Sequence, residues 1–159
     1  MDEPSSPVLT TRDAAILRGL IGRHGAPADG WIRDKLARAR IVLPESVGGD
    51  IVTLNSRVAY AVEDAPPDMR IVIHSDAAAV RGMTLPVHSR RGLALLGARV
   101  GETVALTHDD GRCERLRVTA LAYQPEAAAR PRAGAVVVPF SRRAGTHASG
   151  RAARAGGLA

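Results

Sequence analysis

Three groups of residues in this sequence have side chains that could do chemistry. His74, Ser75 and Asp76 have the residue types of a nucleophilic triad, but adjacent residues of one strand or turn cannot aim at a common point, as a triad requires. The five histidines are scattered and lack the i, i+4 spacing by which two helical histidines bind a metal ion. The one cysteine, Cys113, stands beside a turn, where we expect a small strand residue rather than a nucleophile. We therefore expect no catalytic residue, no metal ligand and no cofactor.

The elements that would position such residues begin with two short helices. Thr10 and Thr11 precede an acidic residue and apolar residues spaced for one helical face, which predicts a helix over residues 13–23. A Gly-Ala-Pro break follows, and Asp29 is then expected to cap a second helix over residues 30–41. Two short helices joined by a few residues form an antiparallel hairpin, and a dozen residues at 1.5 Å each would reach only about 18 Å.

Beyond the hairpin, the pattern changes from helical spacing to strand-like alternation. Strands are predicted over residues 52–62, 70–74, 85–88, 103–108 and 114–123. Ser89 is expected to cap a short helix that runs through Leu96, with Gly97 closing its C-terminal end. An Asp-Asp-Gly sequence at residues 109–111 has the residue types of a tight hairpin turn. Several strands with one short helix predict an α+β domain.

The charge is distributed unevenly along the chain. We expect a helical hairpin over residues 1–47, a sheet domain over residues 48–129 and a basic, disordered tail over residues 130–159. The formal charge is +6, and residues 127–159 alone hold six arginines and no acidic group. The folded part is therefore close to neutral and offers no large cationic face for phosphates. Direct binding of nucleic acid is left open only for the tail.

The composition also bears on the compartment. No run of about eighteen apolar residues exists, and the first residues are acidic and polar, so we expect neither a membrane span nor an export signal. A single cysteine excludes an internal disulfide and a thiolate cluster for zinc. We expect a monomeric protein of the reducing cytoplasm.

Three segments, taken in order, resemble one bacterial family. Residues 50–58 look like that family's opening strand, and residues 93–97 with 100–102 resemble a segment that the family shares with the Gre factors. Residues 123–128, Tyr-Gln-Pro-Glu-Ala-Ala, are similar to its closing motif. The order and spacing of these segments make the chain resemble the regulator of nucleoside diphosphate kinase (Rnk) family, which belongs with the GreA/GreB transcription elongation factors.

The resemblance implies an FKBP-like domain, an antiparallel sheet with one short helix, that follows the hairpin and docks on RNA polymerase core at the rim of the secondary channel. The docking residues that it implies are Ser89, Arg90, Arg91, Gly92, Leu93, Leu96 and Gly97. We expect the first three to make contact, whereas the leucines fill the core and fix the loop. Arg90 stands where the family often has proline, which bears on the affinity for the polymerase.

The resemblance also bears on the tip of the hairpin. In Gre factors a longer hairpin carries acidic residues that help hold a catalytic magnesium ion, which needs hard oxygen ligands. Here the predicted tip, residues 22–30, has one carboxylate, Asp29, together with Arg23 and His24. We interpret Asp29 as a helix cap rather than a metal ligand. We therefore expect a non-catalytic regulator that competes with Gre-type factors without stimulating transcript cleavage.

Two other functions remain open at this stage. The arginine-rich tail could bind DNA or RNA, which would make the chain a nucleic-acid-binding accessory protein. An FKBP-like domain could also be a peptidyl-prolyl isomerase, an activity that needs an apolar, usually aromatic-lined pocket. The predicted sheet domain has only Tyr60 and Tyr123 to line one.

Overall fold

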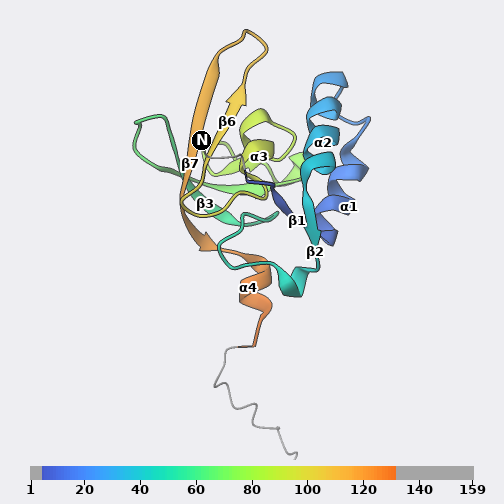
Figure 1. Cartoon of the computed structure of the whole chain (residues 1–159), viewed down its shortest axis with the longest axis vertical. Coiled ribbons are helices and arrows are strands. Elements are labelled where there is room, and N and C mark those ends of the chain that lie inside the picture. Colours follow the sequence, from blue (N-terminus) through green and yellow to red (C-terminus); the bar gives the residue numbers. More distant parts are fainter. Residues whose placement is uncertain (1–4, 132–159) are drawn as a thin grey trace, which may run out of the picture.

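A computed structural model of the chain describes residues 5–131. Its N-terminal part consists of β1 (Val8–Thr10), α1 (Thr11–Leu20), α2 (Ala26–Arg38) and β2 (Arg40–Val42). The two helices form the predicted hairpin, and the two strands pair in parallel at its base (Figure 1). As expected, a threonine hydroxyl caps the first helix: Thr10 Oγ1 accepts a hydrogen bond of 3.0 Å from the Asp13 amide.

The second helix begins earlier than its sequence predicts. It starts at Ala26 because a proline in the first turn needs no backbone N–H there, so Pro27 begins the helix rather than breaking the chain. The prediction that Asp29 is the N-cap is therefore wrong. Asp29 lies inside the first turn, and its Oδ1 accepts a hydrogen bond of 2.9 Å from the Gly22 amide across the connecting turn.

The second helix also ends earlier than predicted. It stops at Arg38, and the β-branched residues Ile41 and Val42 belong to β2 instead. Each strand of the β1–β2 pair has only three residues, and neither was predicted. The pair joins the segment before the hairpin to the segment after it, which closes the base of the hairpin.

The second half of the described chain is a five-stranded sheet of order β5-β4-β3-β7-β6. Its strands are β3 (Arg57–Val62), β4 (Asp68–Ile73), β5 (Thr84–Pro86), β6 (Thr103–Thr107) and β7 (Cys113–Tyr123). Three of the four strand pairs are antiparallel, and β4 and β5 run parallel, which departs from the expected antiparallel sheet. The predicted turn at residues 109–111 joins β6 to β7. The α+β fold class is confirmed.

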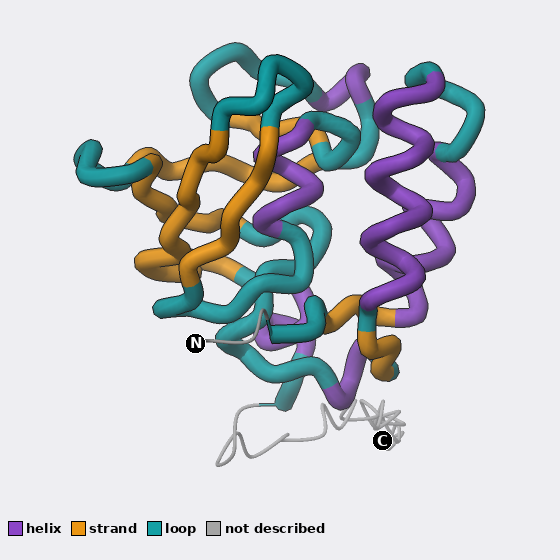
Figure 2. Tube along the Cα trace, turned by 45° about the horizontal axis from the view of Figure 1, so that its top comes forward, coloured by secondary structure: helices purple, strands orange, loops and turns teal. Residues whose placement is uncertain are grey.

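Short helices complete this half of the structure. They are the 3-10 helices η1 (Pro44–Ser46) and η2 (Asp76–Ala78) and the α-helices α3 (Arg90–Leu95) and α4 (Pro125–Ala129). Helix α3 contacts both α2 and the strands β5, β6 and β7. It therefore lies between the hairpin and the sheet, as Figure 1 and Figure 2 both show.

Strand β3 begins five residues later than its alternating sequence suggests. Asn55 has a φ of 65°, a left-handed conformation typical of turns. The Ser56 amide donates to the Thr53 carbonyl at 3.1 Å, and the Thr53 amide donates to Ser56 Oγ at the same distance. These bonds close a turn on the segment that was predicted to extend, so the strand starts only at Arg57.

One buried apolar cluster extends across the hairpin and the sheet. It contains Leu9, Leu17 and Ile32 from the N-terminal part and Val58 and Leu116 from the sheet. Burying this surface together stabilises the docking of the hairpin. The division at residues 47 and 48 stays a prediction, and most of the predicted tail, residues 132–159, lies outside the described residues. Within residues 5–131 no helix is long and apolar enough to cross a membrane.

Candidate docking surface and hairpin tip

The N-terminus of α3 is built as its sequence predicts. Ser89 Oγ accepts a hydrogen bond of 3.1 Å from the Gly92 amide, so Ser89 caps the helix. The same hydroxyl donates to the Pro86 carbonyl at 2.6 Å. The cap thereby joins the end of β5 to the first turn of α3 and fixes the direction in which the helix starts.

Two glycines of the predicted docking segment are packing positions. A Cβ on Gly92 would lie 2.1 Å from the Pro86 carbonyl oxygen, so no other residue fits without moving the backbone. Gly97 has a φ of +83°, and its Cβ would lie 2.9 Å from the Val8 carbonyl oxygen. The backbone of the segment is therefore pressed against β5 on one side and β1 on the other.

The leucines of α3 face the core. Leu93, Leu95 and Leu96 are buried and belong to the shared apolar cluster. Ser89, Arg90 and Arg91 are only partly buried. Of the residues predicted to dock, these three at the helix N-terminus form the part that a partner could touch.

Both arginines are already held by neighbouring side chains. The Arg90 guanidinium carbon lies 3.9 Å from the centre of the Trp31 ring, a cation–π contact between α3 and the hairpin. Its Nη2 is also 3.1 Å from a carboxylate oxygen of Asp109 in the β6–β7 turn. Arg91 forms a bidentate pair with Glu114 at 2.9 and 2.5 Å, and these bonds lower the pKa of Glu114 and raise the pKa of Arg91.

The turn between α1 and α2 brings together residues that the sequence separates. The ring of His24 stacks on the ring of His88, with centroids 3.8 Å apart and planes 5° from parallel. His88 Nε2 is also 3.8 Å from Asp76 Oδ1. Burial, followed by the positive charge of His24, lowers the pKa of His88, and Asp76 acts against them. The histidines looked scattered because their pairing depends on the tertiary fold and leaves no sequence spacing to detect.

The other two residues of the predicted tip take different roles. Arg23 is exposed, and its amide donates to the Leu20 carbonyl at 3.0 Å. One oxygen of the Asp29 carboxylate accepts a hydrogen bond from the Gly22 amide. Asp76 points toward His88 rather than forming the third member of a triad with His74 and Ser75, so this part of the described chain lacks the convergence that a triad needs.

The base of the hairpin is closed by a buried polar cluster that includes the closing motif. Asp13 Oδ2 accepts a hydrogen bond of 3.4 Å from the Leu54 amide. Thr53 Oγ1 donates to Glu126 Oε2 at 2.6 Å. Gln124 donates through Nε2 to the carbonyls of Gly48 and Ile51 at 2.9 and 2.7 Å. Burial raises the pKa of Asp13 to about 6, because a buried carboxylate loses its hydration.

Comparison with known proteins identifies the family. The chain is 34% identical over 105 residues to the "Regulator of nucleoside diphosphate kinase" of Escherichia coli strain K12, a match that spans 65% of this chain and 77% of the relative. The chain belongs to the Rnk family. It is also 28% identical over 82 residues to the transcription elongation factor GreA of Sphingopyxis alaskensis, 52% of each chain. A comparison with models of protein families finds no match.

A solved structure shares the fold of this Rnk-family chain. The prokaryotic transcription elongation factor GreA/GreB from Nitrosomonas europaea superposes with a TM-score of 0.60 at 26% identity, over 76% of this chain and 100% of that one. The Rnk and GreA/GreB likenesses make the chain a transcription-factor-like regulator of the Gre superfamily. The relatives named here are described as regulators or elongation factors rather than as catalysts.

The larger groove of this Rnk-family chain lies beside α3. It has a volume of about 820 Å³ and is lined mainly by residues of α2, α3 and β6, among them Trp31 and Lys35. Lys35 is buried and donates to the Ala94 carbonyl at 3.2 Å, and burial lowers its pKa to about 7. Among the described residues that line the groove, Trp31 is the one aromatic side chain, and Arg90 covers its ring. The groove gives no support to an isomerase site.

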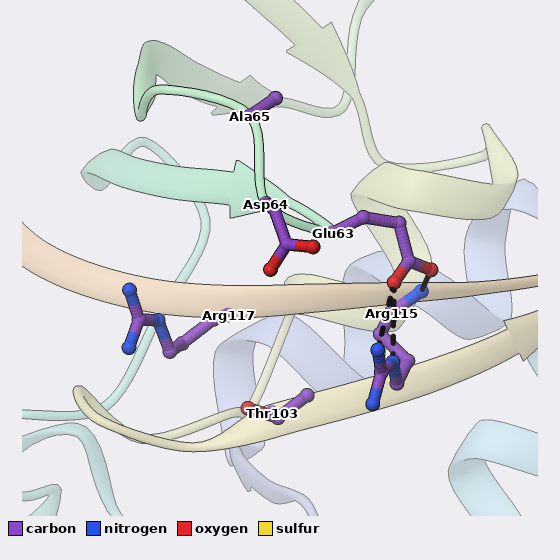
Figure 3. A pocket seen from close by; sticks show the side chains of 6 residues that line it. All are labelled: Glu63, Asp64, Ala65, Thr103, Arg115 and Arg117. Carbon is purple, nitrogen blue, oxygen red and sulfur yellow. Dashed lines mark hydrogen bonds and ion pairs between the residues drawn. The ribbon is translucent and has the colours of Figure 1, made fainter.

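A second cavity, of about 320 Å³, lies between the β3–β4 turn and the strands β6 and β7. Figure 3 shows Glu63 directed toward Arg115, with Asp64 and Arg117 nearby. The Glu63 carboxylate accepts hydrogen bonds of 2.8 Å from the Arg115 amide and 3.1 Å from its guanidinium. These bonds lower the pKa of Glu63 and leave a neutralised, exposed ion pair rather than a reactive group.

Proposed function

We propose that this chain is a non-catalytic transcription regulator that binds RNA polymerase core at the rim of the secondary channel. The observation that carries the proposal is the likeness to a GreA/GreB elongation factor over the whole length of that structure, in a chain of the Rnk family. By docking at the same rim, the protein competes with Gre-type factors.

The contact surface in this proposal is the N-terminus of α3. Ser89, Arg90 and Arg91 are the partly buried side chains of a helix end that its cap holds in place, and a partner would compete with Asp109 and Glu114 for the two guanidinium groups. Arginine is suited to such a surface because its planar group binds carboxylates through two hydrogen bonds. Gly92, Leu93, Leu96 and Gly97 act indirectly, because their burial sets the shape of the segment.

The hairpin in this proposal does not stimulate transcript cleavage. Its longer helix, α2, has 13 residues, which corresponds to about 20 Å at 1.5 Å per residue. Its connecting turn contains Arg23 and His24 and no acidic residue, and the nearby Asp29 is a single carboxylate, one oxygen of which accepts the Gly22 amide. Such a tip lacks the free carboxylates that a catalytic magnesium ion needs.

The test is retention of the full-length chain on immobilised RNA polymerase core. We compare the wild-type chain with Ser89→Asp and Arg91→Glu, and we expect both variants to reduce binding at least about tenfold through like-charge repulsion and lost pairing. Aspartate is as good an N-cap as serine, so Ser89→Asp adds a negative charge while the helix keeps its cap, at the loss of the hydrogen bond that the Ser89 hydroxyl donates to the Pro86 carbonyl. Wild-type binding by both variants would move the contact elsewhere.

A matched control separates this surface from general charge effects. Arg117→Glu makes the same change of charge on β7, at an exposed position between the buried residues Leu116 and Val118, so its side chain lies on the face of the sheet away from α3. We expect this control to bind the polymerase as well as the wild-type chain. A loss of binding equal to that of Arg91→Glu would show that net charge, rather than α3, decides the affinity.

Two further assays address competition and the tail. In a cleavage assay on backtracked complexes, we expect the wild-type chain to produce no cleavage alone and to inhibit cleavage by a Gre factor. Deletion of residues 132–159, which carry five of the arginines, should leave both results unchanged. If the deletion abolished polymerase binding in a strongly salt-dependent way, the function as a nucleic-acid-binding accessory protein would replace this one.

A further inference from the structure

Three potential metal ligands meet where the tip of the hairpin approaches the segment before α3. They are His24 from the α1–α2 turn, Asp76 from η2 and His88 from the loop between β5 and α3. One ligand atom of each lies within 4.8 Å of the other two. Because the three residues come from three separate segments, their meeting is a product of the fold.

The chemistry of these side chains selects the kind of ion. Two imidazoles and one carboxylate form a mixed nitrogen and oxygen set, which suits zinc and its neighbours among the transition metals. Magnesium and calcium prefer sets made of oxygen alone. Three protein ligands would leave a fourth, tetrahedral position open to water.

The ligand atoms of the three side chains must move slightly closer together to bind one ion. Ligand atoms about 2.1 Å from a tetrahedral zinc ion lie about 3.4 Å from one another. His88 Nε2 and Asp76 Oδ1 are 3.8 Å apart, so this pair needs a shift of a few tenths of an ångström. The Asp76 side chain is 66% exposed and free to make it.

The two imidazoles must also change their relative angle. A ring nitrogen binds a metal in the plane of its ring, and the planes of His24 and His88 are 5° from parallel, so one ring must turn before both can point at one ion. The Nδ1 atom of His88 is buried and has no hydrogen-bond partner within the described part of the chain. No hydrogen bond at that atom therefore resists the turn.

We propose that His24, Asp76 and His88 bind one divalent transition-metal ion, with Zn²⁺ as the preferred ion, and that the ion fastens the tip of the hairpin to the segment that leads into α3. The proposal does not depend on polymerase binding, because it rests on the three side chains alone. Its consequence is that metal binding orders the α1–α2 turn, which is otherwise held to the domain there by a stack of two rings.

The test is titration of the full-length, tag-free chain with Zn²⁺ against a chromogenic chelator. We expect one ion per chain for the wild type and an affinity at least about tenfold lower for His24→Ala and for His88→Ala, since even changes outside the ligand set cost that much. Asp76→Asn should weaken binding less, because the amide oxygen remains a ligand. The matched control, His108→Ala, removes a histidine that pairs with Glu114 outside the cluster and should retain the affinity.

Two measurements guard against a misfolded variant or an ion bound elsewhere. Each metal-free variant should still unfold in one cooperative thermal transition, which shows that loss of binding is not loss of fold. On addition of Zn²⁺, hydrogen exchange of residues 21–25 should slow in the wild type and not in His88→Ala. Unchanged affinity in the His24→Ala/His88→Ala double variant, or no slowing of exchange in the wild type, would overturn the proposal.

Discussion

The hairpin is held to the rest of the molecule by different chemistry at its two ends. At its base, β1 pairs with β2, Leu9 is fully buried, and Asp13 accepts the Leu54 amide inside the protein. At its tip, His24 and His88 stack with partial exposure, and Arg90 lies over Trp31. The base is thus closed by a strand pair, buried apolar packing and buried hydrogen bonds. At the tip, Leu20 is buried just before the turn, but the turn itself is held by contacts that water can reach.

This difference indicates which end can adjust. Segments with few buried contacts open at low free-energy cost, and binding elements are often of this kind. The adjustable end is the one next to Ser89, Arg90 and Arg91, the proposed contact surface. A ligand or partner that acts on the tip would therefore change the surface beside α3 without disturbing the base.

The first test of the comparison removes apolar packing at each end. Leu9→Ala should lower the free energy of unfolding by about 4 kcal/mol, because Leu9 lies in β1 at the base, is fully buried and would leave a cavity. Ile21→Ala, at the partly buried start of the turn, should cost less than half as much. Urea unfolding of both variants measures the difference, and equal losses would show that the two ends are equally anchored.

The second test uses the buried carboxylate at the base. Folding raises the pKa of Asp13 from its model-compound value of 3.8 to about 6, so the folded state holds a proton that the unfolded state has released. The contribution of Asp13 to the free energy of unfolding is therefore greatest below pH 4. It falls by about 3 kcal/mol as the pH rises from 4 through 6. Lys35 titrates above this window, at about pH 7.

The matched variant for this test is Asp13→Asn. Its amide oxygen can accept the Leu54 hydrogen bond but does not ionise, so the variant should lack the Asp13 contribution to the slope between pH 4 and pH 6. It should therefore be more stable than the wild type at pH 8, with a smaller difference at pH 4. Urea unfolding at several pH values across this range measures the difference. If the free energy of unfolding changed with pH equally in the two proteins, the raised pKa of Asp13 would be wrong.

The sequence predicted contacts between neighbouring residues, but it missed the contacts that hold both ends of the hairpin. Ser89 as the cap of α3 and the turn at residues 109–111 were predicted correctly, because each depends on residue types within a few positions. The β1–β2 pair was missed, since three residues per strand give no periodicity and their pairing is set by the hairpin between them. The His24–His88 stack was missed for the same reason.

The role of Asp29 shows a different limit. Its residue type and place before an apolar pattern are typical of a helix cap, but Pro27 began the helix earlier and left Asp29 inside it. Its carboxylate accepts a hydrogen bond from the Gly22 amide in the turn before the helix instead. Two residue types that both favour a helix start, proline and aspartate, thus competed here, and the sequence alone did not show which one would begin the helix. The docking role of residues 89–97 is untested and stays a prediction.

A third test addresses the ion pair beside the proposed contact surface. Arg91→Ala should cost about 1 kcal/mol, since the bidentate geometry is favourable but the Arg91 side chain is 43% exposed and solvent screens the charge. A double-mutant cycle with Glu114→Gln isolates the pair from other effects of each change. A coupling energy as large as the loss from Leu9→Ala would mean that this end is anchored as firmly as the base.

The smallest expected effect concerns the contact between α3 and the hairpin. The Arg90 guanidinium over Trp31 should contribute about 0.5 to 1 kcal/mol, the range for cation–π contacts near the surface. A double-mutant cycle of Arg90→Gln with Trp31→Leu, read by urea unfolding, measures it. Because the same contact holds Arg90 in place, Trp31→Leu should weaken polymerase binding more than it weakens the fold. If Trp31→Leu instead weakened the fold more than it weakened polymerase binding, Trp31 would be a core residue. The tip and the docking surface would then not be coupled through this contact.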